Sequence, residues 1–228
     1  MATMTVAKAL NAGLRRALEA DPKVLLAGED IGQLGGVFRI TEHLQRDFGP
    51  ERVVDSPLAE SGIVGTALGM ALRGYRPVVE IQFDGFVYPA FDQIVSQVAK
   101  IQYRTRGAAS APLTIRIPSG GGIGAVEHHS ESTEGYWLHT AGLKVVAPST
   151  PRSVAFVVAA LGDEAVVDIV VLLAGVVLDH AIGHVVVGDQ QAVAGDERAG
   201  AATDPHHRAQ RRRGDVGQFG RIALETRV

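Results

Sequence analysis

Hydrophobic and polar positions alternate with two different periods along the first two thirds of the chain. From Thr5 to Glu19 apolar residues recur at i, i+3 and i+4, which predicts an amphipathic helix with Thr5 as its N-cap. Short apolar runs predict buried strands at Val24–Ala27, Val53–Asp55, Pro77–Ile81, Leu113–Ile117 and Lys144–Ala147. The segments between these runs predict further helices near Thr41–Phe48, Ser61–Leu72 and Ala90–Tyr103. Strands that alternate with helices indicate βαβ units, so we expect an α/β fold, a three-layer α/β/α domain around a mostly parallel sheet.

The composition of the chain changes at Pro151. All four Lys, all four Tyr, all three Met and the only Trp precede residue 152. Beyond that point Ser153–Leu161 has the pattern of a helix and Val166–Leu173 the pattern of a strand, but no recognisable motif follows. We therefore expect a domain over residues 1–151, extending to about residue 175, and an atypical, poorly ordered C-terminal tail over residues 176–228.

Three interpretations of this C-terminal part remain open. The basic run Arg211–Arg213 is typical of a solvated tail. A nucleic-acid-binding patch at Arg208–Arg213 is the functional alternative. Codons rich in G and C give the same mixture of Ala, Val, Gly, Arg, Asp and His when they are translated out of frame. We therefore also hypothesise that the reading frame is lost near Pro151, which resequencing the gene would test.

Charge and cysteine content exclude several classes of function. A net charge of -3 argues against a protein that binds nucleic acid non-specifically, and zero cysteines exclude disulfides, cysteine-based zinc sites and thiol nucleophiles. The apolar run between Asp168 and Asp179 is shorter than the ~20 residues that cross a bilayer, and no signal-like segment opens the chain. We expect a cytoplasmic protein with no membrane or nucleic-acid partner.

Candidate chemistry lies in loops, because functional residues of parallel sheets follow the carboxyl ends of the strands. The loops with polar residues at such positions are Gly28–Asp30, Ser56–Gly62, Gln82–Tyr88 and Ser119–Ser130. Within the second loop Glu60 has two interpretations. A carboxylate beside a helix start commonly caps the helix or interacts with its dipole. The apolar neighbours of Glu60 would instead raise its pKa and keep it protonated as a hydrogen-bond donor.

The glycine-rich fourth loop does not fit the common nucleotide or metal motifs. Gly120–Gly124 lacks both G-x-G-x-x-G and the Walker lysine, so we expect no dinucleotide site. The neighbouring His128 and His129 lack the H-E-x-x-H spacing, so we expect no metal site. A histidine beside such a loop is a better candidate for proton transfer or charge stabilisation.

Ordered motifs carry a resemblance to a known family. They are G-E-D-I-G…G-G-V-F-R at Gly28–Arg39, P-L-A-E-S-G-I-V-G at Pro57–Gly65, E-I-Q-F-D-G-F-V-Y-P-A-F-D-Q-I at Glu80–Ile94, H-H-S-E-S at His128–Ser132 and G-L-K-V-V-A-P-S-T-P at Gly142–Pro151. Their order and spacing resemble the beta subunit of thiamine-diphosphate-dependent 2-oxo acid dehydrogenases, in its transketolase-like pyrimidine-binding domain. The likeness is closest to the branched-chain type, with pyruvate and acetoin dehydrogenases next, and it covers residues 1–151 only.

The resemblance implies roles for individual residues. Glu60 matches the glutamate that hydrogen-bonds N1′ of the cofactor's aminopyrimidine ring and promotes its reactive tautomer. Leu58, Gln82 and Phe86 match cofactor-binding positions around that ring, although relatives often carry a tyrosine where this chain has Phe86. His129 matches the active-site histidine that stabilises charge on the substrate-derived intermediate and assists transfer to the lipoyl group.

The resemblance also implies an activity and partners. The activity is oxidative decarboxylation of a 2-oxo acid, with the branched-chain acids favoured, followed by acyl transfer to lipoamide. In the family an alpha subunit holds the diphosphate and Mg²⁺ through a G-D-G…N motif, which this chain lacks, so we expect an α₂β₂ heterotetramer. We also expect docking to a lipoyl-bearing acyltransferase core. Relatives continue into a second, C-terminal domain that we expect to be absent here. The alternatives are a pyruvate or acetoin dehydrogenase beta subunit, and a truncated or frameshifted remnant without activity.

Overall fold

The computed structural model describes residues 4–120, 124–125, 127–148, 150–153, 169–175 and 187–189. All of them belong to one compact unit, Met1–Ala192. A second unit, Val193–Val228, lies outside the described residues, and so does the basic run Arg208–Arg213.

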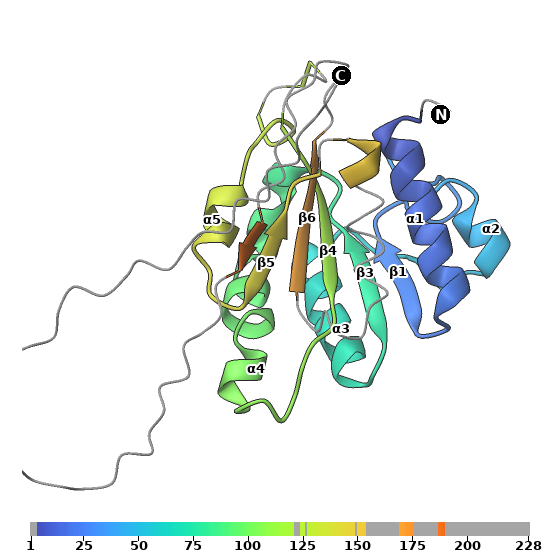
Figure 1. Ribbon diagram of the computed structural model, residues 1–228. Helices are drawn as coiled ribbons and strands as arrows, with labels where there is room; N and C mark the ends of the chain where they lie inside the picture. Colours follow the sequence, from blue (N-terminus) through green and yellow to red (C-terminus); the bar gives the residue numbers. More distant parts are fainter. Residues whose placement is uncertain are drawn as a thin grey trace, which may run out of the picture. The chain divides into compact units, whose positions relative to one another are not determined.

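A parallel sheet with flanking helices forms the described unit (Figure 1). The strands are β1 Val24–Gly28, β2 Val53–Asp55, β3 Arg76–Glu80, β4 Thr114–Ser119, β5 Leu143–Val146, β6 Ile169–Gly175 and β7 Val187–Asp189. The helices are α1 Val6–Ala20, α2 Leu44–Phe48, α3 Glu60–Leu72, the 3-10 helix η1 Asp84–Ala90, the π-helix η2 Gln93–Val98, α4 Ile101–Arg104 and α5 Glu134–Leu138. The strand order is β2-β1-β3-β4-β6-β5-β7, and every neighbouring pair is parallel except β5–β7. The expected mostly parallel sheet is therefore confirmed.

Helices cover both faces of the sheet because successive residues of a strand point to opposite sides. In β1, Leu26 packs with Leu10 of α1 in one buried cluster, which also includes a residue of α2. The next residue, Ala27, packs with Val64 of α3 in a second cluster, which also includes residues of η1, η2 and α5. These two clusters confirm the expected three-layer α/β/α architecture.

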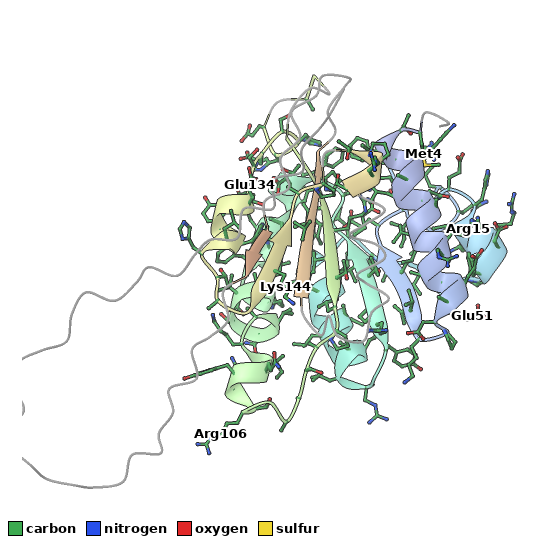
Figure 2. The ribbon with its side chains drawn as sticks, viewed as in Figure 1. Met4, Arg15, Glu51, Arg106, Glu134 and Lys144 are labelled. Atoms are coloured by element: carbon green, nitrogen blue, oxygen red, sulfur yellow. The ribbon has the colours of Figure 1, made fainter. Side chains whose placement is uncertain are left out.

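The first helix begins where its sequence predicts. The Thr5 side chain accepts a hydrogen bond from the Lys8 backbone N–H at 3.3 Å, which confirms Thr5 as the N-cap of α1. On its outer side, Arg15 lies toward α2 (Figure 2) and donates to Asp47 at 2.6 Å. Among the described residues, no helix is both long enough and apolar enough to cross a membrane.

The prediction of a single helix over Ala90–Tyr103 is wrong. The chain instead forms the end of η1, the π-helix η2 and the short α4. The interruption falls where the turn before β5 lies directly on this segment. A Cβ on Gly142 would lie 2.0 Å from the carbonyl oxygen of Ala99, and Lys100 Nζ donates to the carbonyl oxygen of Ala141 at 2.7 Å. The close contacts at Ala99 and Lys100 thus fall where the π-helix ends, and such π-turns occur mostly as short interruptions of α-helices.

The chain beyond Pro151 contributes strands to the sheet. β6 overlaps the strand expected at Val166–Leu173 and lies between β4 and β5, parallel to both. β7 falls inside the segment for which a tail is expected, and it pairs antiparallel with β5. A strand between β4 and β5 satisfies backbone groups that both would otherwise expose. The helix expected at Ser153–Leu161 lies outside the described residues after Ser153.

The strand order also determines where a ligand can bind. From β1 the chain moves to β2 on one side of it, and it then returns to β3 on the other side. Ligands of open parallel sheets bind beyond the carboxyl ends of the strands at such a switch point. The loops after β1, β2, β3 and β4 all lie at this edge, because these strands are parallel.

Candidate functional site

Glu60 is a buried carboxyl group at the first position of α3. Its side chain is only 7% exposed, although it lies at the start of a helix. The N-cap position is Ala59, which offers no side-chain cap, and within the described residues no backbone N–H donates to the Glu60 carboxylate. Glu60 therefore does not cap the helix that it begins, and its carboxyl is left for another partner.

A second buried carboxyl lies within electrostatic reach of Glu60. Glu29 directly follows β1 and is 8% exposed, and its Oε1 has no hydrogen-bond partner among the described residues. Burial raises the pKa of Glu29 above its ordinary value, and the charges of Glu60 and Asp30 raise it further. Glu29 therefore holds a proton more readily than an ordinary glutamate does, at the edge of the sheet where these loops meet.

Replacing Glu29 by glutamine is expected to raise the stability of the chain at neutral pH. Because the folded state raises the pKa of this acid, stability falls as the pH rises from about 4.5 through the folded-state pKa. Between pH 4.5 and pH 7, urea unfolding should show a smaller loss of unfolding free energy in Glu29→Gln than in the native chain. The exposed acid Glu42 supplies the control, Glu42→Gln, which should follow the native chain. If the unfolding free energy changed equally with pH in all three proteins, the raised pKa of Glu29 would be contradicted.

Gln82 connects the loop after β3 to the loop after β1. Its Nε2 donates to Oδ2 of Asp30 at 3.2 Å, and its side chain is partly buried. Leu58, in the loop before α3, is 78% exposed, which is unusual for a large apolar side chain so close to buried acids. An apolar side chain in this position can pack against a flat ring or against a partner protein.

His129 lies against aromatic rings of the loop after β3. Its ring centroid is 4.5 Å from that of Phe83 and 5.1 Å from that of Phe86, and Phe83 also contacts Phe38 of the first loop. The Nδ1 of His129 is 2.9 Å from the carbonyl oxygen of Glu127. Because a carbonyl can only accept, Nδ1 carries the proton in this contact, and Nε2 is the nitrogen that can exchange a proton with a ligand.

The structure places all of the residues that the sequence singles out at one edge of the sheet. Leu58 lies on the loop after β2 and Glu60 at the start of the next helix, α3; Gln82 lies on the loop after β3 and Phe86 in the helix η1 that follows it; His129 lies on the loop after β4. The adjacent residues Gln82 and Phe83 join the acidic side of the site to its aromatic side. Among the described residues, no group of three or more His, Asp or Glu side chains is arranged to hold a metal ion.

Sequence reasoning missed two contributors to this site. The sequence singles out the loop that contains Glu29, but no local pattern shows that this side chain is buried or that the charge of Glu60 acts on it. Phe83 has the same residue type as Phe86, and only the fold shows that both rings contact His129. His128 is exposed and has a left-handed backbone with φ of 66°, so it does not share the position of its neighbour.

Residues 2–173 match the protein family described as "Transketolase, pyrimidine binding domain". The chain belongs to this family. The pyrimidine-binding domain match continues past Pro151, where the likeness in motifs ends, and it includes most of β6. Thiamine diphosphate is the cofactor of this family, and its aminopyrimidine ring is the part to which the domain's name refers.

Curated relatives of this pyrimidine-binding domain are beta subunits. The chain is 68% identical over 150 residues to "Pyruvate dehydrogenase E1 component subunit beta" of Leifsonia xyli subsp. xyli, an alignment that covers 66% of this chain and 44% of that protein. It is 62% identical over 149 residues to "3-methyl-2-oxobutanoate dehydrogenase subunit beta" of Mycobacterium tuberculosis. That alignment covers 65% of this chain and 43% of that protein. The resemblance to 2-oxo acid dehydrogenase beta subunits is thus confirmed. The chain spans less than half the length of these relatives.

A solved structure shares the fold of the chain. It is described as "Split gene transketolase, inactive beta4 tetramer", and it aligns with a TM-score of 0.60 at 17% identity. The alignment covers 76% of this chain and 52% of that chain. This likeness confirms the transketolase-like architecture of the sheet and its helices.

Proposed function

We propose that the chain contributes the aminopyrimidine half of a thiamine-diphosphate site in a 2-oxo acid dehydrogenase. The observation that carries this proposal is Glu60, a buried carboxyl at a helix start that makes no capping hydrogen bond within the described residues and interacts electrostatically with a second buried acid, Glu29. The pyrimidine-binding domain family and the beta-subunit relatives support it. The proposed domain comprises residues 1–151 and extends to about residue 175.

The residues present fit an aminopyrimidine ring. Glu60 offers a carboxyl that can share a proton with the ring nitrogen N1′, and burial raises the pKa of the second acid, Glu29, whose charge interacts with that of Glu60. Leu58 and Phe86 supply apolar surface for the faces of the ring, and Gln82 supplies an amide at its edge. Relatives that carry a tyrosine at the position of Phe86 have a phenolic hydroxyl that this site lacks.

The chemistry divides between the cofactor and the protein. When bound, thiamine diphosphate supplies an electron sink for the bond that breaks as a 2-oxo acid loses carbon dioxide. Glu60 holds a proton at the ring nitrogen, which favours the reactive tautomer. The Nδ1–H of His129 donates to the carbonyl of Glu127, which leaves Nε2 to take up a proton. Once Nε2 is also protonated, its N–H can donate to a substrate oxygen and stabilise negative charge there.

The proposal requires a partner chain. An alpha subunit would supply the contacts to the diphosphate and Mg²⁺, in an α₂β₂ assembly that passes the acyl group to a lipoyl-bearing acyltransferase core. The substrate is a 2-oxo acid, and the branched-chain acids are the finer proposal. The relatives include both a pyruvate and a 3-methyl-2-oxobutanoate enzyme, so both substrates belong in one assay.

A catalytically silent remnant is the second candidate, because the shared motifs end at Pro151 and the composition of the chain changes there. Co-expression of the full chain with an alpha subunit separates the two. The proposal predicts a complex on size exclusion and cofactor-dependent release of carbon dioxide from 3-methyl-2-oxobutanoate, with pyruvate assayed beside it. Faster turnover of pyruvate would reverse the substrate assignment. Absence of a complex and of turnover would support the remnant.

A further inference from the structure

We propose that Asp84 and Thr133 are positioning residues for His129, through a buried hydrogen-bond chain that holds the loop of residues 127–133 against η1. The effect of this positioning on catalysis rests on the proposed function. The structural part of the inference, the placement of the imidazole, is independent of that function.

The chain of hydrogen bonds begins at Asp84, the first residue of η1. Its Oδ2 accepts from the Thr133 backbone N–H at 3.0 Å, and its Oδ1 accepts from the Thr133 hydroxyl at 2.5 Å. The same hydroxyl accepts from Trp137 Nε1 at 2.9 Å. All three side chains are at most 2% exposed. Hydrogen bonds in such a dry network are strong and have fixed directions, because no water competes for them.

A second set of contacts holds the middle of the same loop. The Gly85 backbone N–H donates to the His128 carbonyl at 3.2 Å, and a Cβ on Gly85 would lie 2.5 Å from the Cα of His128. The Gly120 N–H donates to the Glu131 carbonyl at 3.0 Å. The backbone on either side of His129 therefore lies directly on η1 and on the end of β4.

One short segment of chain carries both kinds of contact to the loop. Phe83 and Phe86, which contact the His129 ring, flank the pair Asp84 and Gly85, which contact the loop backbone. A shift of the loop relative to η1 would therefore move the imidazole relative to both phenyl rings. Because catalytic groups must be held within about 0.5 Å of their productive position, such a shift would reach the chemistry.

Burial and hydrogen bonding act in opposite directions on Asp84. Burial raises the pKa of this acid and the two hydrogen bonds from Thr133 lower it, while the charges of Glu134 and Glu131 raise it. The two hydrogen bonds from Thr133 therefore stabilise the charged form of Asp84. Their loss would leave Asp84 without the donors that this structure provides, which favours a rearrangement of the loop.

A matched pair of variants at Thr133 tests the proposal in the full chain. Thr133→Ser keeps the hydroxyl, whereas Thr133→Val keeps the shape and removes it. With ¹³C-labelled histidine, the ring signal of His129, assigned by its absence in His129→Gln, reports the ring currents of Phe83 and Phe86. We expect the native position in Thr133→Ser and a move toward the signal of the exposed His139 in Thr133→Val. An unmoved signal in a folded Thr133→Val chain would overturn the proposal. If Thr133→Val fails to fold, Asp84→Asn, which leaves only one acceptor oxygen, serves in its place under the same criteria.

The kinetic arm uses the same variants assembled with an alpha subunit. We expect kcat to fall about 100-fold in Thr133→Val with little change in KM, because a misplaced catalytic group loses rate rather than affinity. Thr133→Ser should restore the native kcat, and Asp92→Asn, a change of an exposed acid that follows η1, should be without effect. A native kcat alongside a displaced His129 signal would overturn the consequence for catalysis. If the native assembly has no turnover, the proposed function fails, and the signal of His129 still decides the positioning.

Discussion

Replacing Glu60 by glutamine is expected to lower the cofactor-dependent turnover of the assembled complex by about 100- to 10,000-fold. Glutamine keeps the shape of the side chain and its burial, but its amide cannot share a proton with a ring nitrogen as a carboxyl does. The loss should appear in kcat with both pyruvate and 3-methyl-2-oxobutanoate, since Glu60 acts on the cofactor rather than on either substrate. Initial rates of carbon dioxide release at saturating cofactor measure it.

Glu51→Gln is the matched control for this experiment, because Glu51 is an exposed acid that lies away from α3 (Figure 2). It should keep the native rate and the native elution volume with the alpha subunit. A fall of less than tenfold in Glu60→Gln, in a complex of native size, would contradict the role of this carboxyl.

Replacing Arg116 by methionine is expected to lower the free energy of unfolding by about 3–5 kcal/mol. Arg116 of β4 is 1% exposed, and its Nε donates to Oε2 of Glu80 on β3 at 3.2 Å. Both side chains line a small cavity with room for about one water molecule, and Arg116 Nη1 and Glu80 Oε1 have no hydrogen-bond partner among the described residues. Removing the cation alone would leave a buried carboxylate without its counterion.

The double variant Glu80→Leu with Arg116→Met separates this cause from a general loss of packing. Replacing a whole buried ion pair by apolar side chains is commonly neutral or stabilising, so we expect the double variant to be more stable than Arg116→Met. Urea titrations followed by the fluorescence of Trp137, the only and fully buried tryptophan, measure both. A double variant less stable than the single variant would show that packing around Arg116 dominates.

Much of the fold follows from local patterns in the sequence. Strands such as β1 are uninterrupted apolar runs between polar turns, and α1 has an apolar stripe with a threonine at its start, so short-range rules find both. The carboxyl of Glu60 among apolar residues beside a predicted helix start leaves two interpretations open, and only the family resemblance favours the role in cofactor binding. The five residues with proposed roles lie on loops or at the starts of helices that follow β2, β3 and β4 at one edge of the sheet, which a parallel sheet predicts.

The rest depends on contacts between distant segments. The break at η2 is associated with the approach of Gly142 to Ala99, which no pattern within residues 90–103 contains. Thr133 looks like an ordinary loop residue until Asp84, 49 positions earlier, is placed beside it. The β-branched residues of β6 predict a strand. Its place between β4 and β5 follows only from its pairing with both of these strands.

Calorimetric titration of thiamine diphosphate in the presence of Mg²⁺ tests the central claim most directly. The cofactor is titrated into the alpha subunit alone, and into the alpha subunit mixed with the native chain or with Glu60→Ala. If this chain holds the aminopyrimidine half of the site, the mixture with the native chain binds more tightly than the alpha subunit alone, and Glu60→Ala removes most of the gain. The same Kd in all three titrations would contradict the account.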